Sequence, residues 1–292
     1  MFIGCQLAHH TSELPTQYPL VAEPKLDGFR LVAHIDGDRK VTFYSRGGKS
    51  EPFTANLAHV AEALSASGAK DCYVDGEISA GTWNDTAKLV RLKSPSAAQL
   101  AVIRARVVFH AFDIVPLDSI ESAPVGRVVR MVCRESHTQR SARLGFILDS
   151  RFACIIVVPG VVVNSPAEVE LVHGKNLAAG HEGTMLKRMD APYVFDRTEN
   201  WIALKPTRTV DARILGSIEG AGKHVGRLGA LEVEAADGTR FRVGTGFNDK
   251  ERAALWAERA SLVGLWVEAR MQDCSVATAR HPSFVRMRPD RD

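Results

Sequence analysis

The sequence predicts an α+β protein of two domains, in which antiparallel sheets with flanking helices are followed by a small β-barrel. The chain has 292 residues, a length typical of about two domains. Segments with strand character outnumber helical ones. After Pro206 the pattern changes to short strands separated by glycines and by the turn Asp237-Gly238. We therefore place the domain boundary near residue 208, with domains over 1–208 and 209–292.

Three segments of the first domain are expected to be helical. Residues 54–67 carry apolar side chains at helical spacing, and Gly68 marks their end. Ser165-Pro166-Ala167-Glu168 fits a capping box with proline at the first helical position, so we expect a helix from there to Gly180. The third is a basic stretch between 121 and 150 that contains several arginines.

The other periodic segments favour β-strands. In the first domain these cover 31–35, 41–44, 72–78, 107–115, 154–158, 184–187 and 201–205. In the second domain short strands are expected over 212–218, 228–235, 239–243 and 262–269, with one helix over 249–259. Short strands with one interposed helix predict a closed barrel of the OB type.

The composition is that of an ordinary globular protein, with 45% hydrophobic and 24% charged residues. No stretch approaches the roughly 18 apolar residues of a membrane helix, and the first residues do not form a signal peptide, so we expect a cytoplasmic protein. The five cysteines are an odd number without a Cys-x-x-Cys pair, which argues against disulfides and structural zinc. A formal net charge of +3 permits nucleic acid as a partner without demanding it.

One motif places a lysine beside a sharp turn. Residues 23–30 read Glu-Pro-Lys-Leu-Asp-Gly-Phe-Arg, so the amine of Lys25 precedes the turn at Asp27-Gly28. Taken alone, this pattern also fits a β-turn with a solvated lysine. Further short motifs follow it in order: Ser45-Arg46, Asp75-Gly76-Glu77, Ala111-Phe112-Asp113, Glu182-Gly183-Thr184-Met185-Leu186-Lys187, Trp201-Ile202-Ala203-Leu204-Lys205-Pro206, Arg280-His281-Pro282-Ser283-Phe284 and Arg288-Pro289-Asp290-Arg291.

This ordered set resembles the covalent nucleotidyltransferase superfamily, and most closely the small ATP-dependent DNA ligases of phage and bacterial type. The resemblance extends from Glu23 to the C-terminus. It implies an ATP-grasp-like adenylation domain followed by an OB-fold domain. It also implies a monomer that joins nicks in double-stranded DNA with ATP and Mg²⁺ or Mn²⁺.

The resemblance identifies Lys25 as the nucleophile that attacks the α-phosphate of ATP to give a lysyl-adenylate. An ordinary lysine amine has a pKa of about 10.4, so its deprotonation at pH 7 costs about 4–5 kcal/mol. Other cations in a site reduce this cost because they disfavour the ammonium. Lys187 and Lys205, at the matching family positions, would supply such a field and stabilise the charge on the phosphate.

The same resemblance assigns the remaining ATP contacts. Phe112 would stack on adenine, although a lone phenylalanine in such a strand is more often part of a core. Strand periodicity places Met185 on the same face as Lys187. The other expected contacts are Glu23, Arg30, Arg46 and Glu77. Glu182 would bind the metal together with Glu77, because carboxylate oxygens suit a hard cation.

The resemblance also predicts residues that contact DNA or orient pyrophosphate. Arg46 matches a family position linked to the phosphate and the nick, and Arg288, Asp290 and Arg291 lie in the final motif. Apart from the resemblance, basic residues such as Arg46, Lys49, Lys223 and Arg227 are expected to contact DNA phosphates. An exposed basic tail is the alternative interpretation of that motif. Because 24 residues precede Lys25 in this sequence, we expect DNA affinity to come from the two domains themselves and to depend steeply on salt.

The chain departs from the family at Ala203, where Lys-x-Lys is usual and this sequence has Ala203-Leu204-Lys205. The missing cation should weaken lysine activation or phosphate binding, unless Arg188 or His181 compensates. Two alternative functions remain open. One is an RNA ligase or a capping-type nucleotidyltransferase. The other is a non-catalytic OB protein that binds nucleic acid, motivated by Ala203.

Overall fold

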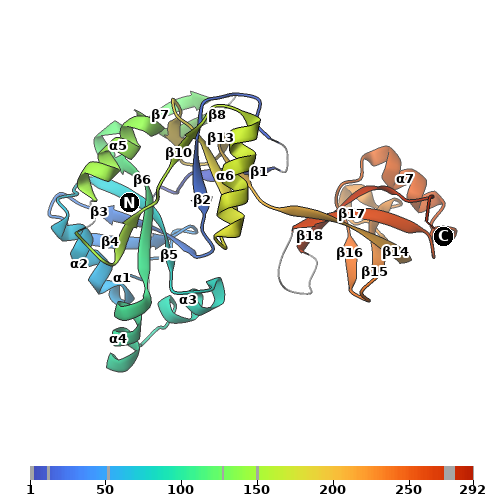
Figure 1. Cartoon of the computed structure of the whole chain (residues 1–292), viewed down its shortest axis with the longest axis horizontal. Coiled ribbons are helices and arrows are strands. Elements are labelled where there is room, and N and C mark those ends of the chain that lie inside the picture. Colours follow the sequence, from blue (N-terminus) through green and yellow to red (C-terminus); the bar gives the residue numbers. More distant parts are fainter. Residues whose placement is uncertain are drawn as a thin grey trace. The chain divides into compact units, whose positions relative to one another are not determined.

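The computed structural model describes residues 3–11, 14–50, 53–126, 128–148, 151–272 and 280–291, without the side chains of 207, 272, 280 and 281. The chain divides into two compact units, Met1–Leu204 and Lys205–Asp292 (Figure 1). The boundary expected near residue 208 lies at the start of β14 (Thr207–Glu219), a few residues past this division. No helix in the described ranges is long and apolar enough to cross a membrane.

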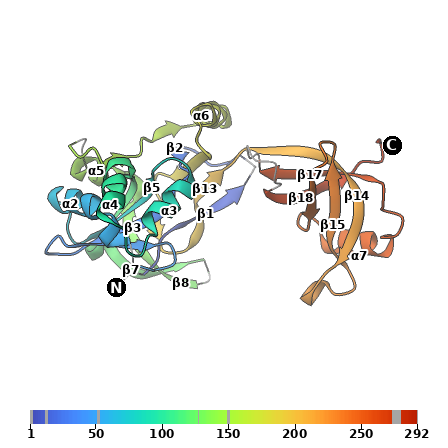
Figure 2. The same ribbon diagram turned by 90° about the horizontal axis from the view of Figure 1, so that it is seen from below.

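The first sheet of unit 1 presents one apolar and one polar face. Its strand order is β1 (Leu7–Thr11), β13 (Arg197–Leu204), β11 (Gly183–Arg188), β2 (Leu20–Lys25) and β10 (Val161–Val163). Helix α6 (Pro166–Ala178) packs against the face that carries Leu20, Ala22 and Leu186 (Figure 2). Because side chains alternate along a strand, Glu23 and Lys25 of β2 point to the opposite face, as do Met185 and Lys187 of β11.

The second sheet of unit 1 has the order β4 (Val41–Ser45), β3 (Phe29–Ile35), β5 (Cys72–Ser79), β6 (Val108–Pro116) and β9 (Ile155–Val157). One face packs with helices α1 (Phe53–Asn56), α2 (Ala58–Ala66), α4 (Ala97–Arg106) and α5 (His137–Ile147) in the largest apolar core. Helix α3 (Trp83–Val90) follows β5. Side chains of the other face join those of the first sheet in a separate cluster that includes Val32, Phe112 and Trp201.

The two five-stranded sheets of unit 1 are mixed, because each adds one parallel pair to the antiparallel pairing expected from the sequence. Strand β1 pairs with β13 in parallel, and β6 pairs with β9 in parallel. The other pairs within these two sheets are antiparallel.

The prediction of a basic helix between 121 and 150 was wrong over the first half of this segment. This part forms the antiparallel strands β7 (Ile120–Val125) and β8 (Val128–Ser136), which continue into β12 (Pro192–Val194) as a three-stranded sheet. The β-branched residues Val128, Val129 and Val132 favour a strand. Helix α5 begins only after Ser136, which forms a capping box with Gln139.

Unit 2 is a five-stranded sheet with one helix. The order is β16 (Arg240–Val243), β15 (Leu228–Ala235), β14, β17 (Trp266–Gln272) and β18 (Arg280–Met287), and helix α7 (Asp249–Ala257) packs near β15. The strand expected over 262–269 starts only at Trp266, because Gly264 turns the chain with φ of +92°.

The expected closed barrel is only partly closed. Between the edge strands β16 and β18, the described residues provide a single isolated bridge, from Thr245 to Ser283, instead of a continuous ladder. The apolar core of the unit lies inside this curved sheet and includes Ile214, Leu231 and Val267. This arrangement is a partly open barrel, which is usual for OB folds.

Candidate active site

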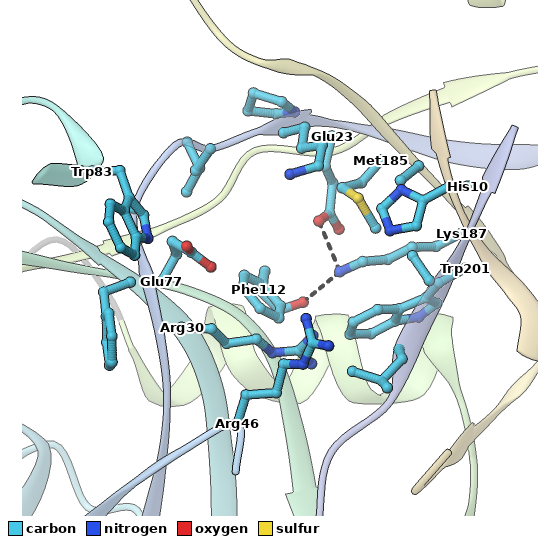
Figure 3. Close-up of a pocket in the computed structure, with 18 of the residues that line it drawn as sticks. His10, Glu23, Arg30, Arg46, Glu77, Trp83, Phe112, Met185, Lys187 and Trp201 are labelled. Carbon is cyan, nitrogen blue, oxygen red and sulfur yellow. Dashed lines mark hydrogen bonds and ion pairs between the residues drawn. The ribbon is translucent and has the colours of Figure 1, made fainter. Parts of the chain in front are cut away.

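A cavity of about 490 Å³ opens on the polar face of the first sheet in unit 1. It is lined from both large sheets, by residues of β1, β2, β11 and β13 on one side and of β3, β5 and β6 on the other (Figure 3). Eight of the residues expected from the sequence lie around it, namely Glu23, Lys25, Arg30, Arg46, Glu77, Phe112, Met185 and Lys187. Such a concave site with converging charged groups suits a small polar ligand.

Lys25 is the last residue of β2, and its ammonium forms an ion pair with the carboxylate of Glu182. The backbone fixes this pair, because the Glu182 amide donates a hydrogen bond to the Lys25 carbonyl at 3.0 Å. Gly28 in the following turn lies against β5, where a Cβ would overlap the Ile78 carbonyl and the Glu77 side chain. The Asp-Gly turn therefore brings Lys25 close to Glu77.

Lys187 is almost completely buried, at 1% exposure, and forms the base of the cavity. Its Nζ lies 2.7 Å from Glu23 Oε2 and donates to the Phe112 carbonyl at 2.8 Å (Figure 3). The same ammonium lies 4.9 Å from the centre of the Phe112 ring and 4.5 Å from that of Trp201. Burial raises the pKa of Glu23, whereas the positive charge of Lys187 lowers it. The carboxylate and the ammonium thus compensate each other at a site shielded from water.

Arg30 is held by a bidentate ion pair with Asp75, with distances of 3.0 and 2.6 Å. The buried hydroxyl of Tyr193 donates to Asp75 as well, at 2.5 Å. The Arg30 guanidinium lies 5.3 Å from the centre of the Phe112 ring and 5.4 Å from that of Trp201. This network fixes the guanidinium at the cavity wall with an orientation that suits a polar ligand.

The carboxyl group of Glu77 has a raised pKa. Burial raises its pKa from 4.5 to about 7, although the nearby charges of Arg30 and Lys25 lower it. The charges of Asp75 and Glu182 contribute to the increase. A carboxyl group of this kind is typical of functional sites, because near neutral pH it exchanges protons readily or accepts a cation.

The remaining expected residues lie elsewhere. Lys49 is exposed after β4, where its backbone pairs with Ser45. Lys205 begins unit 2, which also contains Arg288, Asp290 and Arg291. There, Arg288 pairs with Asp290 at 2.7 Å and with Asp211 at 2.8 Å, and Arg291 pairs with Asp211 at 2.9 Å.

Several cavity residues were missed by sequence reasoning. Trp201 precedes Ala203 by two positions, so strand periodicity could have identified it. His10 and Arg197 also line the cavity, and Trp83 of α3 stands 44% exposed at its edge. No local signal marks His10, because its position depends on the pairing of β1 with β13.

The two residues expected to compensate for Ala203 do not line the cavity. Arg188 donates to Gln17 and pairs with Asp190 at 3.6 Å. His181 follows helix α6 and donates its amide to the Asn176 carbonyl. Ala203 itself lines the cavity and lies in register with His10.

Two family models match this chain. The model described as the ATP dependent DNA ligase domain matches residues 6–205, and the DNA ligase OB-like domain matches residues 219–288. The chain is 30% identical over 260 residues to a DNA ligase of Halobacterium salinarum, a match that covers 84% of this chain and 44% of that protein. The chain therefore spans less than half the length of this relative.

Two solved structures are similar to this chain over nearly its whole length. The structure named Pmar-Lig_PreS3 has a TM-score of 0.76 and 25% identity, over 98% of this chain and 68% of the other. A structure from an analysis of Lig E DNA ligases, described as binding DNA with a minimal scaffold, has a TM-score of 0.66 and 25% identity. That likeness covers 99% of this chain and 100% of the other.

Proposed function

The chain belongs to the family of ATP-dependent DNA ligases, and we propose on this basis that it seals nicks between a 5′-phosphate and a 3′-hydroxyl in duplex DNA. The reaction would proceed through a lysyl-adenylate on Lys25 and an adenylated DNA. The observation that carries this proposal is the position of Lys25 at the cavity, beside Glu182 and close to Glu77.

Lys25 is the residue that we expect to carry AMP. After loss of a proton, its Nζ attacks the α-phosphorus of ATP, and the N–P bond forms as the bond from that phosphorus to pyrophosphate breaks. The carboxylate of Glu182 contacts the Lys25 ammonium directly and is placed to accept this proton. The second step transfers AMP to the 5′-phosphate and releases Lys25, and in the third the 3′-hydroxyl displaces AMP. Positioning and charge stabilisation dominate such phosphoryl transfers.

The inner part of the cavity suits the nucleoside of ATP. Phe112 and Met185 offer apolar surfaces for the adenine ring, and Glu23, which pairs with Lys187, lines the same cavity with a carboxylate that can accept from an amino group. Arg30 and Glu77 line the same cavity and would bind the ribose. Arg46, also at the cavity, is placed to bind phosphate.

A divalent cation fits this site only with help from substrate. Among the described residues, no group of three or more side chains could hold a metal ion. Glu77 and Glu182 are close enough for each to influence the other electrostatically, and they supply two carboxylates. Mg²⁺ is often held by one or two carboxylates together with phosphate oxygens and water. Bound there, Mg²⁺ or Mn²⁺ would neutralise phosphate charge.

DNA is the proposed partner of both units. Arg46 lines the cavity, Lys49 is an exposed cation that follows β4 in unit 1, and Lys223 and Arg227 lie in unit 2. Arg288, Asp290 and Arg291 are proposed to orient pyrophosphate. The Lig E ligases, described as binding DNA with a minimal scaffold, support DNA binding by a chain of this size. Phosphate contacts of this kind give sequence-independent affinity.

Incubation with ATP labelled on the α-phosphate tests the proposal. We expect label that survives denaturation in the natural protein and is absent from Lys25→Ala, whereas Lys175→Ala, which alters an exposed lysine of α6, retains it. Addition of nicked DNA should then transfer the label and seal the nick. Absence of covalent label would support a non-catalytic protein. Labelling by GTP, or sealing of nicked RNA in preference to DNA, would support a capping enzyme or an RNA ligase instead.

A further inference from the structure

A buried histidine lies directly behind the proposed nucleotide site. His137 is the first residue of α5 and is 1% exposed. Its Nε2 lies 3.7 Å from Glu23 Oε1, and its Nδ1 lies 3.6 Å from Asp113 Oδ2. Neither ring nitrogen has a hydrogen-bond partner among the described residues. The ring is therefore placed between two carboxylates without a close contact to either.

The protonated ring fits this position better than the neutral ring. A neutral imidazole has one N–H donor and one acceptor nitrogen, so it would direct a lone pair at one of the two carboxylates. An imidazolium has two donors and can face both. Buried polar groups of this kind need a partner of opposite character, since an unpaired one destabilises the fold.

Asp113 is a fixed anion in this arrangement. It is fully buried and accepts two hydrogen bonds from Arg140, at 2.7 and 3.1 Å. Burial alone would raise the pKa of Asp113, but the Arg140 guanidinium and His137 hold it well below its usual range. A backbone hydrogen bond from His137 to the Ala191 carbonyl at 3.0 Å fixes the start of α5 beside it.

Glu23 lies on the other side of the His137 ring from Asp113. One oxygen contacts Lys187 at 2.7 Å, and the other faces His137. The pKa of Glu23 is raised on balance, because burial outweighs the charges of Lys187 and then His137, which lower it. Loss of the charge behind Glu23 would shift it toward the protonated form.

The protonation state of Glu23 matters for the base that binds. An ionised carboxylate only accepts hydrogen bonds and matches the amino group of adenine, whereas a protonated carboxyl can donate to the keto oxygen of guanine. We propose that His137, as an imidazolium between Glu23 and Asp113, keeps Glu23 ionised and so makes the site select ATP over GTP. This inference rests on the proposed function, and His137 acts as a positioning residue because Glu23 stands between it and the base.

Single-turnover labelling with ATP and with GTP tests this inference. We expect His137→Gln, which keeps a polar side chain without the charge, to reduce the ATP-to-GTP ratio of adenylation rates at least tenfold. In His137→Gln this ratio should recover as the pH rises, because Glu23 then ionises even without a positive charge at position 137. His59→Gln is the matched control, since His59 is also buried in unit 1 but contacts the Val107 carbonyl away from the cavity.

Nucleotide binding to Lys25→Ala, measured by calorimetry with and without His137→Gln, gives a second readout that does not need the covalent step. Circular dichroism establishes that each variant is folded, and His137→Asn replaces any that is not. Equal losses with both nucleotides and an unchanged ratio would overturn the inference and leave His137 a structural role. If the natural protein takes label from neither nucleotide, the proposed function itself fails, which is a different outcome.

Discussion

Ala203 of β13 lies in register with His10 of β1, and both side chains line the cavity that contains Lys25. Met185 of β11 lies in register with Ala203 on one side and with Glu23 on the other, so the four residues form one row across the sheet. In this row a methyl group occupies the position where the family usually has a lysine. The imidazole of His10 is the polar group on the residue paired with it across β1 and β13.

Ala203→Lys is expected to raise the rate of at least one of the three steps about tenfold. A lysine here would project into the cavity, and a charge-assisted hydrogen bond to phosphate contributes about 1.5–3 kcal/mol. Single-turnover rates of adenylation, of AMP transfer to DNA and of sealing, measured separately, show which step changes. Unchanged rates in all three would contradict a missing cation.

Two histidines of β1 extend this experiment, with His10 as a second test and His9 as its control. His10→Ala should slow the affected step in the natural chain and have less effect beside Lys at 203. His9 pairs with Ile202, whose side chain packs with the α6 core, so it belongs to the other face of the sheet. We therefore expect His9→Ala to leave the three rates unchanged.

Glu77→Gln is expected to stabilise the protein at high pH. The pKa of Glu77 is raised from 4.5 to about 7 by burial, so the folded state holds a proton over a range in which the unfolded chain has lost it. The ionised group therefore destabilises the fold above pH 7, by up to about 3 kcal/mol, and this effect disappears as the pH falls toward 4.5. The free energy of urea unfolding should increase for the variant at pH 8 and hardly differ at pH 5.

The same variant should lose activity while it gains stability, because Glu77 is a proposed metal and ribose ligand. Glu170→Gln, on the exposed side of α6, removes a charge away from the cavity and should show no such pH dependence. A stability gain of Glu77→Gln that is equal at pH 5 and pH 8 would show that the carboxyl does not titrate in this range.

Nick sealing is expected to slow steeply as salt increases. Contacts of lysine and arginine with DNA phosphates release counterions, so affinity falls with a slope close to the number of contacts. At subsaturating DNA we expect a loss of more than about tenfold between 50 and 200 mM salt. Arg46→Ala and Lys49→Ala should each lower the slope by about one, and Lys175→Ala should leave it unchanged. A flat profile would argue against the proposed contacts.

Much of the site could be predicted from the sequence because many site residues lie on strands that line the cavity. Residues two apart share a strand face, which placed Met185 with Lys187. This pattern depends on residues adjacent in sequence and therefore needs no knowledge of the fold. The Asp-Gly pair after Lys25 was also visible in the sequence, but the structure requires glycine at position 28 for a tertiary reason, because a Cβ there would overlap the Ile78 carbonyl of β5.

The parts that were missed depend on contacts between distant segments. His137 becomes important only because α5 starts beside Glu23, which is far away in sequence. The arginines between 121 and 136 suggested a helix, yet pairing of β7 with β8 and β12 turned this segment into a sheet. Tertiary pairing overrides local propensity in such cases. Helices α3 and α4 were also missed, and each is marked only by a short cap, at Thr82 and at Ser96.

Arg252→Ala is expected to destabilise unit 2 by about 3 kcal/mol. The Arg252 side chain is 8% exposed and lies over the ring of Phe247, at 5.3 Å from its centre. It donates to the carbonyls of Leu228 and Gly229 at 2.8 and 3.0 Å and to that of Gly244 at 2.8 Å, so it joins α7 to β15 and to the end of β16. Its removal leaves these acceptors without a partner in a largely buried position.

Hydrogen exchange of peptides that cover β15 and β16 measures this loss within unit 2. Arg259→Ala is the matched control, because Arg259 belongs to the same region but is exposed, and it contacts Trp256 with a ring distance of 4.7 Å and a hydrogen bond to its carbonyl. Its removal should cost less than about 1 kcal/mol. Exchange that accelerates equally in the two variants would mean that the three carbonyl contacts of Arg252 do not hold the sheet together, and water would then have to satisfy those carbonyls as well as the guanidinium does.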